Sequence, residues 1–137
     1  MTIDPLETII TWLASALTIV EGRVAGKHRY GEGWSESQTG VSVHMDGGAV
    51  DLYSPVTEPR LEVRIYASDQ PKVVDVWRAL IALSRAQERF AVVTSKGTAL
   101  VHSFKPESGL SMPYDEILKK DLGVVFFTSK ISEEAVA

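Results

Sequence analysis

The side chains in this sequence that are suited to acid–base or metal chemistry are three histidines and several close pairs of carboxylates. His44 and Asp46 lie two residues apart in an alternating stretch, so both side chains face the same side of a predicted strand. His102 lies in another predicted strand. A metal site needs three or four convergent ligands, and the spacing identifies only two. We therefore predict no metal and no cofactor, and interpret these residues as solvent-facing positions of a sheet.

The paired carboxylates lie in polar loops or in the tail, where such groups usually serve solubility rather than acid–base chemistry. The sequence contains no nucleophile elbow, no Walker loop and no dinucleotide-binding glycine motif. It also has no cysteine, which excludes disulfides and thiolate chemistry. The motif inventory therefore predicts that the protein is not an enzyme. The pairs are Glu32 and Glu36, Asp115 and Glu116, and Glu133 and Glu134.

Composition and charge narrow the class of protein further. The chain has 137 residues, of which 45% are hydrophobic and 23% charged, as expected for one globular domain spanning 1–137. Its net charge is −4, and the acidic excess lies in residues 1–58, so it lacks the basic surface of a duplex binder. The longest apolar stretch near the start, residues 8–20, is too short to cross a bilayer. We expect no membrane partner and a cytoplasmic chain.

Apolar residues recur at helical spacing in two stretches and alternate in several others. Asp4 and Pro5 predict the start of the first helix, and Glu7 is expected to complete its capping box. A second helix is predicted to begin at residues 68–71 (SDQP) and to bury Val73, Val76, Trp77 and Leu80. The predicted strands are residues 41–46, 60–67, 90–94, 98–104 and 123–129, with 49–53 as a short strand or an extended arm.

The order of these elements predicts an α+β fold. We expect a mixed or antiparallel sheet of four to five strands, two amphipathic helices packed on one face, and a long extended loop or arm at 23–59. Residues 131–137 are expected to form a flexible tail.

The tryptophans fall into two environments. Trp77 lies on the apolar stripe of the second helix, and Trp12 lies beside that of the first, so both are expected in or near the core. Trp34 and Tyr53 lie instead in polar, irregular segments. Exposed aromatic residues in such segments are candidate anchors for a partner surface, although the segments could equally fold back and cover them.

Residues 39–83 carry a resemblance. Residues 39–48 (TGVSVHMDGG) form a strand ending in a double glycine, residues 58–66 (EPRLEVRIY) form a proline-led strand ending at an aromatic, and an amphipathic helix follows. This succession resembles the tail completion proteins, or tail terminators, of long-tailed bacteriophages, and the first helix and the late strands extend the likeness over most of the chain. Ala67 departs from the glycine that often follows the aromatic in that family.

The resemblance implies a homo-oligomeric ring, usually of six subunits, in the virion tail at the head–tail junction. Such a ring caps the tail tube, stops its polymerisation and presents a surface to the head connector or stopper protein. DNA would pass through the lumen without specific binding, because an acidic or neutral lumen neutralises few phosphates. We expect contacts from residues 30–58 and 106–116. The candidate interface residues are Tyr30, Trp34, Glu36, Asp46, Asp51, Leu52, Tyr53, Pro55, Met112 and Tyr114.

Two other classes remain open. The chain could be a different assembly component of the same particle, such as a connector or a tube-like subunit. It could also be a small-ligand-binding α+β domain or a minor enzyme. A stable monomer that does not join tail tubes would favour the ligand-binding domain or minor enzyme.

Overall fold

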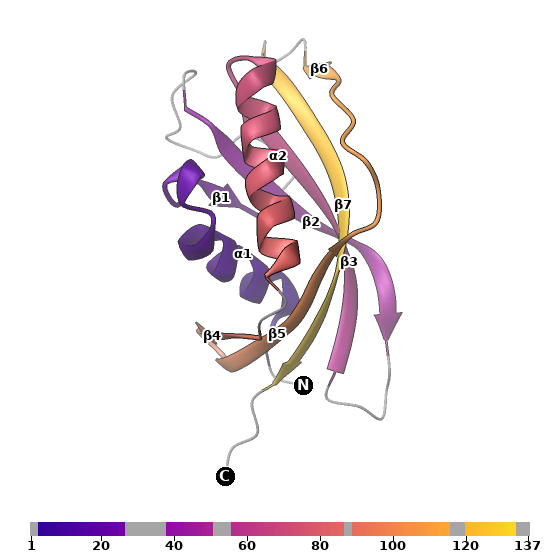
Figure 1. Ribbon diagram of the computed structural model, residues 1–137. Coiled ribbons are helices and arrows are strands. Elements are labelled where there is room, and N and C mark those ends of the chain that lie inside the picture. Colours follow the sequence, from indigo (N-terminus) through magenta and orange to yellow (C-terminus); the bar gives the residue numbers. More distant parts are fainter. Residues whose placement is uncertain (1–2, 27–37, 51–55, 87–88, 116–119, 134–137) are drawn as a thin grey trace.

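The computed structural model describes residues 3–26, 38–50, 56–86, 89–115 and 120–133 (Figure 1). Most of these residues belong to one curved sheet and two helices. The helical elements are α1 (Pro5–Ala16), the 3-10 helix η1 (Thr18–Val20) and α2 (Gln70–Arg85). The strands are β1 (Val24–Ala25), β2 (Gly40–Val50), β3 (Val56–Ala67), β4 (Phe90–Thr94), β5 (Gly97–Pro106), β6 (Tyr114–Asp115) and β7 (Lys120–Glu133).

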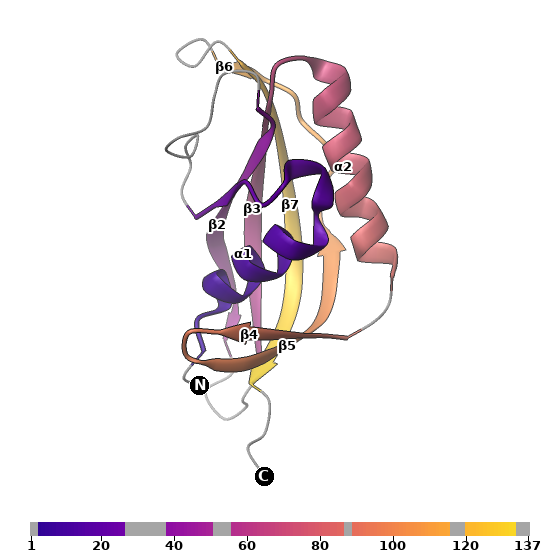
Figure 2. The same cartoon turned by 90° about the vertical axis from the view of Figure 1, so that its left-hand side faces the viewer.

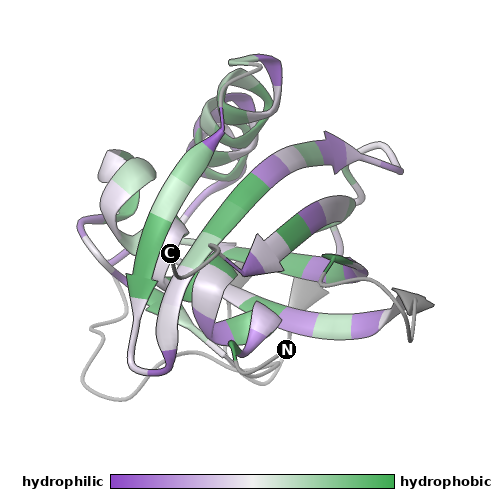
Figure 3. Cartoon of the chain, turned by 90° about the horizontal axis from the view of Figure 1, so that it is seen from below, coloured by the Kyte–Doolittle hydropathy of each residue, from purple (hydrophilic) through white to green (hydrophobic). Residues whose placement is uncertain are grey.

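Six strands lie side by side in the order β1-β2-β3-β7-β5-β4, and the short β6 pairs with β7. The β1–β2 pair is parallel and the other pairs are antiparallel. The register shifts between Met45 and Gly48 in β2, and between Val101 and Ser103 in β5. Such bulges bend a strand and increase its twist. The sheet curls into a half-barrel, as the view along the strands shows (Figure 3).

The expected sheet of four to five strands with two helices packed on one face is therefore wrong. The strands are longer than the apolar alternation indicated, because β7 has 14 residues and β3 has 12. Strands of this length coil as they twist, so the sheet wraps around the helices rather than supporting them as a flat layer. Two strands of two residues each, β1 and β6, are too short to leave a periodic signal.

Each helix begins as the sequence predicts. The Asp4 carboxylate accepts from the amide of Leu6 at 2.9 Å, and the Asp69 carboxylate accepts from the amide of Lys72 at 3.0 Å. Helix α1 packs against the two ends of the sheet, β1–β2 and β4–β5, whereas α2 packs on the central strands β3, β7 and β5 (Figure 2). The half-barrel thus has α2 along its inside and α1 across its opening.

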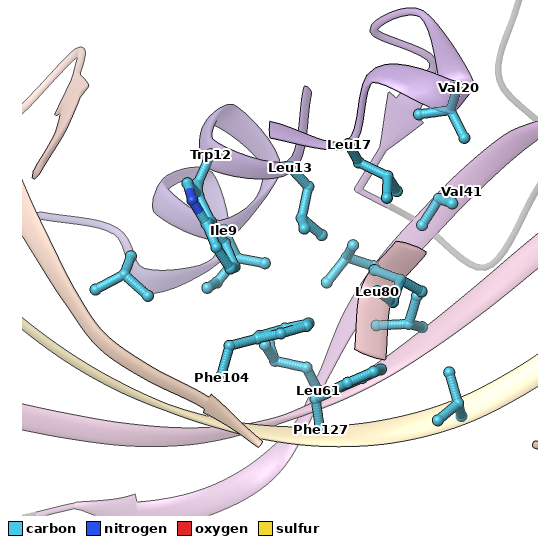
Figure 4. Close-up of a cluster of buried hydrophobic side chains, with 14 of the residues drawn as sticks. Ile9, Trp12, Leu13, Leu17, Val20, Val41, Leu61, Leu80, Phe104 and Phe127 are labelled. Atoms are coloured by element: carbon cyan, nitrogen blue, oxygen red, sulfur yellow. The ribbon is translucent and has the colours of Figure 1, made fainter. Parts of the chain in front are cut away.

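The core lies between the helices and the inner face of the sheet. Phe104 of β5 and Phe127 of β7 stack with ring centroids 4.1 Å apart, and Trp12 meets Phe104 edge-on at 5.1 Å (Figure 4). Trp12 is buried, whereas Trp77 is only partly buried at the border of the core. Ile131 is fully buried in β7, so the flexible tail expected from residue 131 does not begin there.

Candidate functional site

The outer face of the sheet carries a compact group of polar residues around Arg60. The Arg60 guanidinium donates through Nε to the Glu107 carboxylate at 2.7 Å, and through an Nη atom to Asp46. It also lies over the Phe126 ring, 4.1 Å from the centroid. Glu107 in turn accepts from the Thr128 hydroxyl. We call Asp46, Arg60, Glu107, Phe126 and Thr128 the outer-face cluster.

Strand register brings these residues together. Arg60 of β3 lies opposite Thr128 of β7, and Phe126 is the next outward-facing residue of β7. Beyond the end of β5, the Glu107 amide donates to the Phe126 carbonyl at 2.8 Å. Asp46 lies in the stretch where the register of β2 shifts. The cluster therefore depends on three strands and the start of one loop.

The charges of the cluster are paired and only half covered. Hydrogen bonds from Thr128 and Arg60 hold the pKa of Glu107 below its usual range. The side chains of Arg60, Asp46 and Glu107 are 38%, 47% and 40% exposed, so solvent screens their attraction. Such pairs add little to folding stability. They do fix the positions of a ring, two carboxylates and a guanidinium on one surface.

The structure connects the two segments from which contacts were expected. Asp46 belongs to 30–58 and Glu107 to 106–116, and Arg60 bridges them. Met112 is 43% exposed. Tyr114 lies in β6 opposite Asp121 of β7, and its side chain is outside the described residues. The candidates that also lie outside them are Tyr30, Trp34, Glu36, Asp51, Leu52, Tyr53 and Pro55.

Sequence reasoning missed Arg60, Glu107 and Phe126. The outward orientation of Arg60 could have been predicted, because Arg60 precedes the inward-facing Leu61 in a clearly alternating strand. Glu107 and Phe126 have none, because their proximity follows from the β3–β7 and β5–β7 registers.

Both ends of the described sheet are open, and they differ. At one end, β1 pairs with Val41 and Ser42 of β2, and no other described strand pairs with the remainder of β2 on that side. At the other end, β4 is the last strand. Val93 of β4 is 76% exposed and Met45 of β2 is 36% exposed, which places one large apolar side chain on each edge. A sheet with two unlike edges presents two unlike surfaces for association.

A cavity of about 360 Å³ lies between α1, the end of α2 and β5. Trp12, Phe90 and Phe104 supply apolar walls, and His102 and Lys105 supply polar atoms. His102 Nε2 lies 2.6 Å from the Ser132 hydroxyl. Burial, and then the positive charges of Arg89 and Lys130, lower the pKa of His102, which favours the neutral imidazole. The Ser132 hydroxyl is a hydrogen-bond partner of the ring, and the three aromatic walls make the cavity suited to an apolar guest.

The described residues contain no cluster of three or more potential metal ligands. Neither of their helices is long and apolar enough to span a bilayer. No protein-family model matches the sequence, and no curated protein matches it. The interpretation of function therefore depends on the sequence resemblance and on the geometry above.

Proposed function

We propose that this chain is a structural subunit of a bacteriophage tail that assembles into a ring, caps the tail tube and joins it to the head connector. The observation that carries the proposal is the curled sheet with two unlike open edges, β2 and β4. A closed ring requires each subunit to present one surface to one neighbour and a different surface to the other. Two unlike edges on one rigid body meet that requirement.

The resemblance supports the same proposal through a local feature. The double glycine at the end of the matched strand, Gly47 and Gly48, lies at the bulge of β2, and both residues have positive φ. A side chain at position 48 would meet the backbone oxygen of Glu58 at 2.3 Å, so the close approach of β2 to β3 requires glycine there. The motif that suggested the family is thus a structural requirement of the β2–β3 hairpin.

The outer-face cluster gives the ring a second surface for other partners. Its four polar members already hydrogen-bond to one another, and its partly exposed phenyl ring adds apolar area. Polar groups whose positions are fixed in advance lose little conformational entropy on binding. We propose that this cluster contacts the tube protein or the connector.

The test uses the chain with tubes of the tail-tube protein encoded nearest to it in its own genome. We expect a closed ring by mass measurement, rings at tube ends by electron microscopy, and arrest of tube growth when the chain is added. Open-ended polymers of the chain alone would favour a tube-like subunit. A monomer that leaves tube growth unchanged would overturn the proposal.

A small-ligand-binding domain is the second candidate, and the cavity of about 360 Å³ is the observation that favours it. Titration of the protein in solution with a panel of aromatic and aliphatic fragments distinguishes the ligand-binding function from the ring function. A fragment that quenches tryptophan fluorescence through Trp12 and stabilises a monomer would support the ligand-binding function.

A further inference from the structure

Strand β4, the last strand of the described sheet, has the composition of an edge that is open to pairing with a further strand. Its five residues, FAVVT, include no charge and no proline, and no bulge interrupts its pairing with β5. Natural sheets protect free edges with such devices because an apolar edge recruits other strands. Val93 is 76% exposed on this edge. No other described strand covers this edge, and its own sequence carries none of these protective devices.

A groove of about 280 Å³ runs between this edge and helix α1. Trp12 and Phe90, whose ring centroids are 5.2 Å apart, contribute its aromatic lining. The helix side also contributes small residues, Thr11, Ser15 and Ala16, which leave room for a backbone to approach. The indole N–H of Trp12 is buried and has no acceptor within the described residues. A groove between a helix and a free edge is the geometry in which an extended segment adds as a new strand.

The width of this groove is held by contacts at the β4–β5 turn. Glu7, in the first turn of α1, accepts the Ser95 amide at 2.8 Å instead of completing the expected capping box. The Thr94 hydroxyl donates to the Gly97 carbonyl at 2.6 Å across the same turn. The hydrogen bond from Ser95 holds the pKa of Glu7 below its usual range. The edge and the helix are thus pre-positioned for an incoming strand.

We propose that this groove receives the β2 edge of a neighbouring copy, so that β4 of one subunit and β2 of the next form a continuous sheet around the ring. The inference rests on the proposed function and specifies its subunit interface. Met45, on the inner side of β2, would enter the groove against Trp12 and Phe90. Val93, on the outer side of β4, would then lie beside outward-facing side chains of β2 such as His44.

Charge favours this occupant over a second β4. Residues 45–58, which include the exposed part of β2, carry three acidic residues and no basic one. Residues 85–97, which include β4, carry three basic residues and one acidic residue. Opposite net charges steer the two edges toward each other, and like charges oppose pairing of β4 with itself.

Cross-linking tests the pairing directly, because the chain has no cysteine of its own. Val93→Cys and His44→Cys, both exposed on the outer side of their strands, are mixed and treated with a short bismaleimide, which tolerates a small register difference. We expect heterodimers from the mixture only, and a ladder ending at the ring size from a double variant. Homodimers of Val93→Cys alone would show β4–β4 pairing and overturn the proposal. A link from Val93→Cys to tube protein only would overturn it as well.

A charge variant separates this inference from the proposed function. Val93→Lys should raise the concentration needed for ring formation at least about tenfold, since an edge lysine opposes strand addition. Ala82→Lys, at an exposed position of α2, is the matched control and should assemble normally. If rings form and cap tubes while Val93→Lys assembles like the control, the edge pairing is wrong and the ring function stands. If the unmodified chain forms no ring, the proposed function fails.

Discussion

The inner and outer faces of β7 show how one strand serves two purposes. Phe127 points inward, is fully buried and stacks on Phe104, whereas its neighbour Phe126 points outward, is half-buried and lies under the Arg60 guanidinium. The inward residue is covered entirely by its own chain. The outward residue is covered in part, by a charged side chain that solvent still reaches. The comparison teaches that the described chain completes its own interior and leaves its outer face and edges exposed.

The same contrast separates the centre of the sheet from its ends. The central strands β3, β7 and β5 are paired on both sides and covered by α2. Strands β2 and β4 each pair fully on one side only, and each exposes a large apolar side chain. Stability should therefore depend on the centre of the sheet, and the proposed ring assembly on its two ends.

The largest expected effect is on the inner face. Phe127→Ala should lower the free energy of unfolding by about 3–5 kcal/mol, because it leaves a cavity beside Phe104. Phe126→Ala, its matched neighbour, should cost only about 1–2 kcal/mol, since it loses partial burial and one cation–π contact. Urea unfolding followed by circular dichroism measures both. Equal losses would show that the outer face is as essential to the fold as the inner face.

The second effect concerns the bulge that shapes the β2 edge. Gly48→Ala should cost about 2–3 kcal/mol, because its φ is +121° and the new methyl group would meet backbone atoms of β3. Gly47→Ala is the control: its φ is +82° and nothing lies within 4 Å, so about 1 kcal/mol of backbone strain is expected. Thermal unfolding compares the two variants. Similar melting temperatures would argue against a close approach of the strands at Gly48.

The sequence predicts the individual elements better than their assembly. Apolar alternation in residues 60–67 and the helix-start signals at Asp4 and in residues 68–71 depend on local chemistry, and each appears in the structure as expected. The curl of the sheet follows from two bulges and from strand length, neither of which leaves a periodic signal. Local patterns could not show that Ile131 continues a strand.

The candidate site could be predicted from the sequence only in part, again because local patterns do not show which strands pair. Asp46 was identified from its segment, but Arg60, Glu107 and Phe126 become neighbours only through long-range register. Glu7 illustrates the same limit, since its sequence position predicts a capping box and its carboxylate instead reaches Ser95 across the fold. Side chains with a choice between a local and a distant partner cannot be assigned from spacing alone.

Replacing Arg60 should affect folding stability less than the substitutions above, but should weaken binding of the proposed ring to its partners. Arg60→Met keeps the apolar stem and removes two half-exposed ion pairs, so unfolding should change by about 1 kcal/mol or less. Binding of the ring to tubes or to the connector should weaken, as measured by co-sedimentation with tubes. Arg78→Met, at an exposed position of α2, is the control for loss of one positive charge. A large loss of stability with normal binding would place Arg60 in the fold rather than in the interface.

The smallest effect is a pH dependence at Glu107. Its folded pKa is lowered, chiefly by the Thr128 hydrogen bond and then by that from Arg60, so its carboxylate stabilises the fold at neutral pH. That contribution is present above the pKa of the unfolded chain and is lost as pH falls through the lower, folded pKa. The difference in urea midpoint between the natural chain and Glu107→Gln should therefore shrink between about pH 7 and about pH 3. Glu58→Gln, at an exposed position of β3, controls for removal of a surface carboxylate. A difference that stays constant or grows on acidification would mean that the contacts of Glu107 do not favour its charged form. The outer-face cluster would then lack the fixed charges on which its proposed role in binding depends.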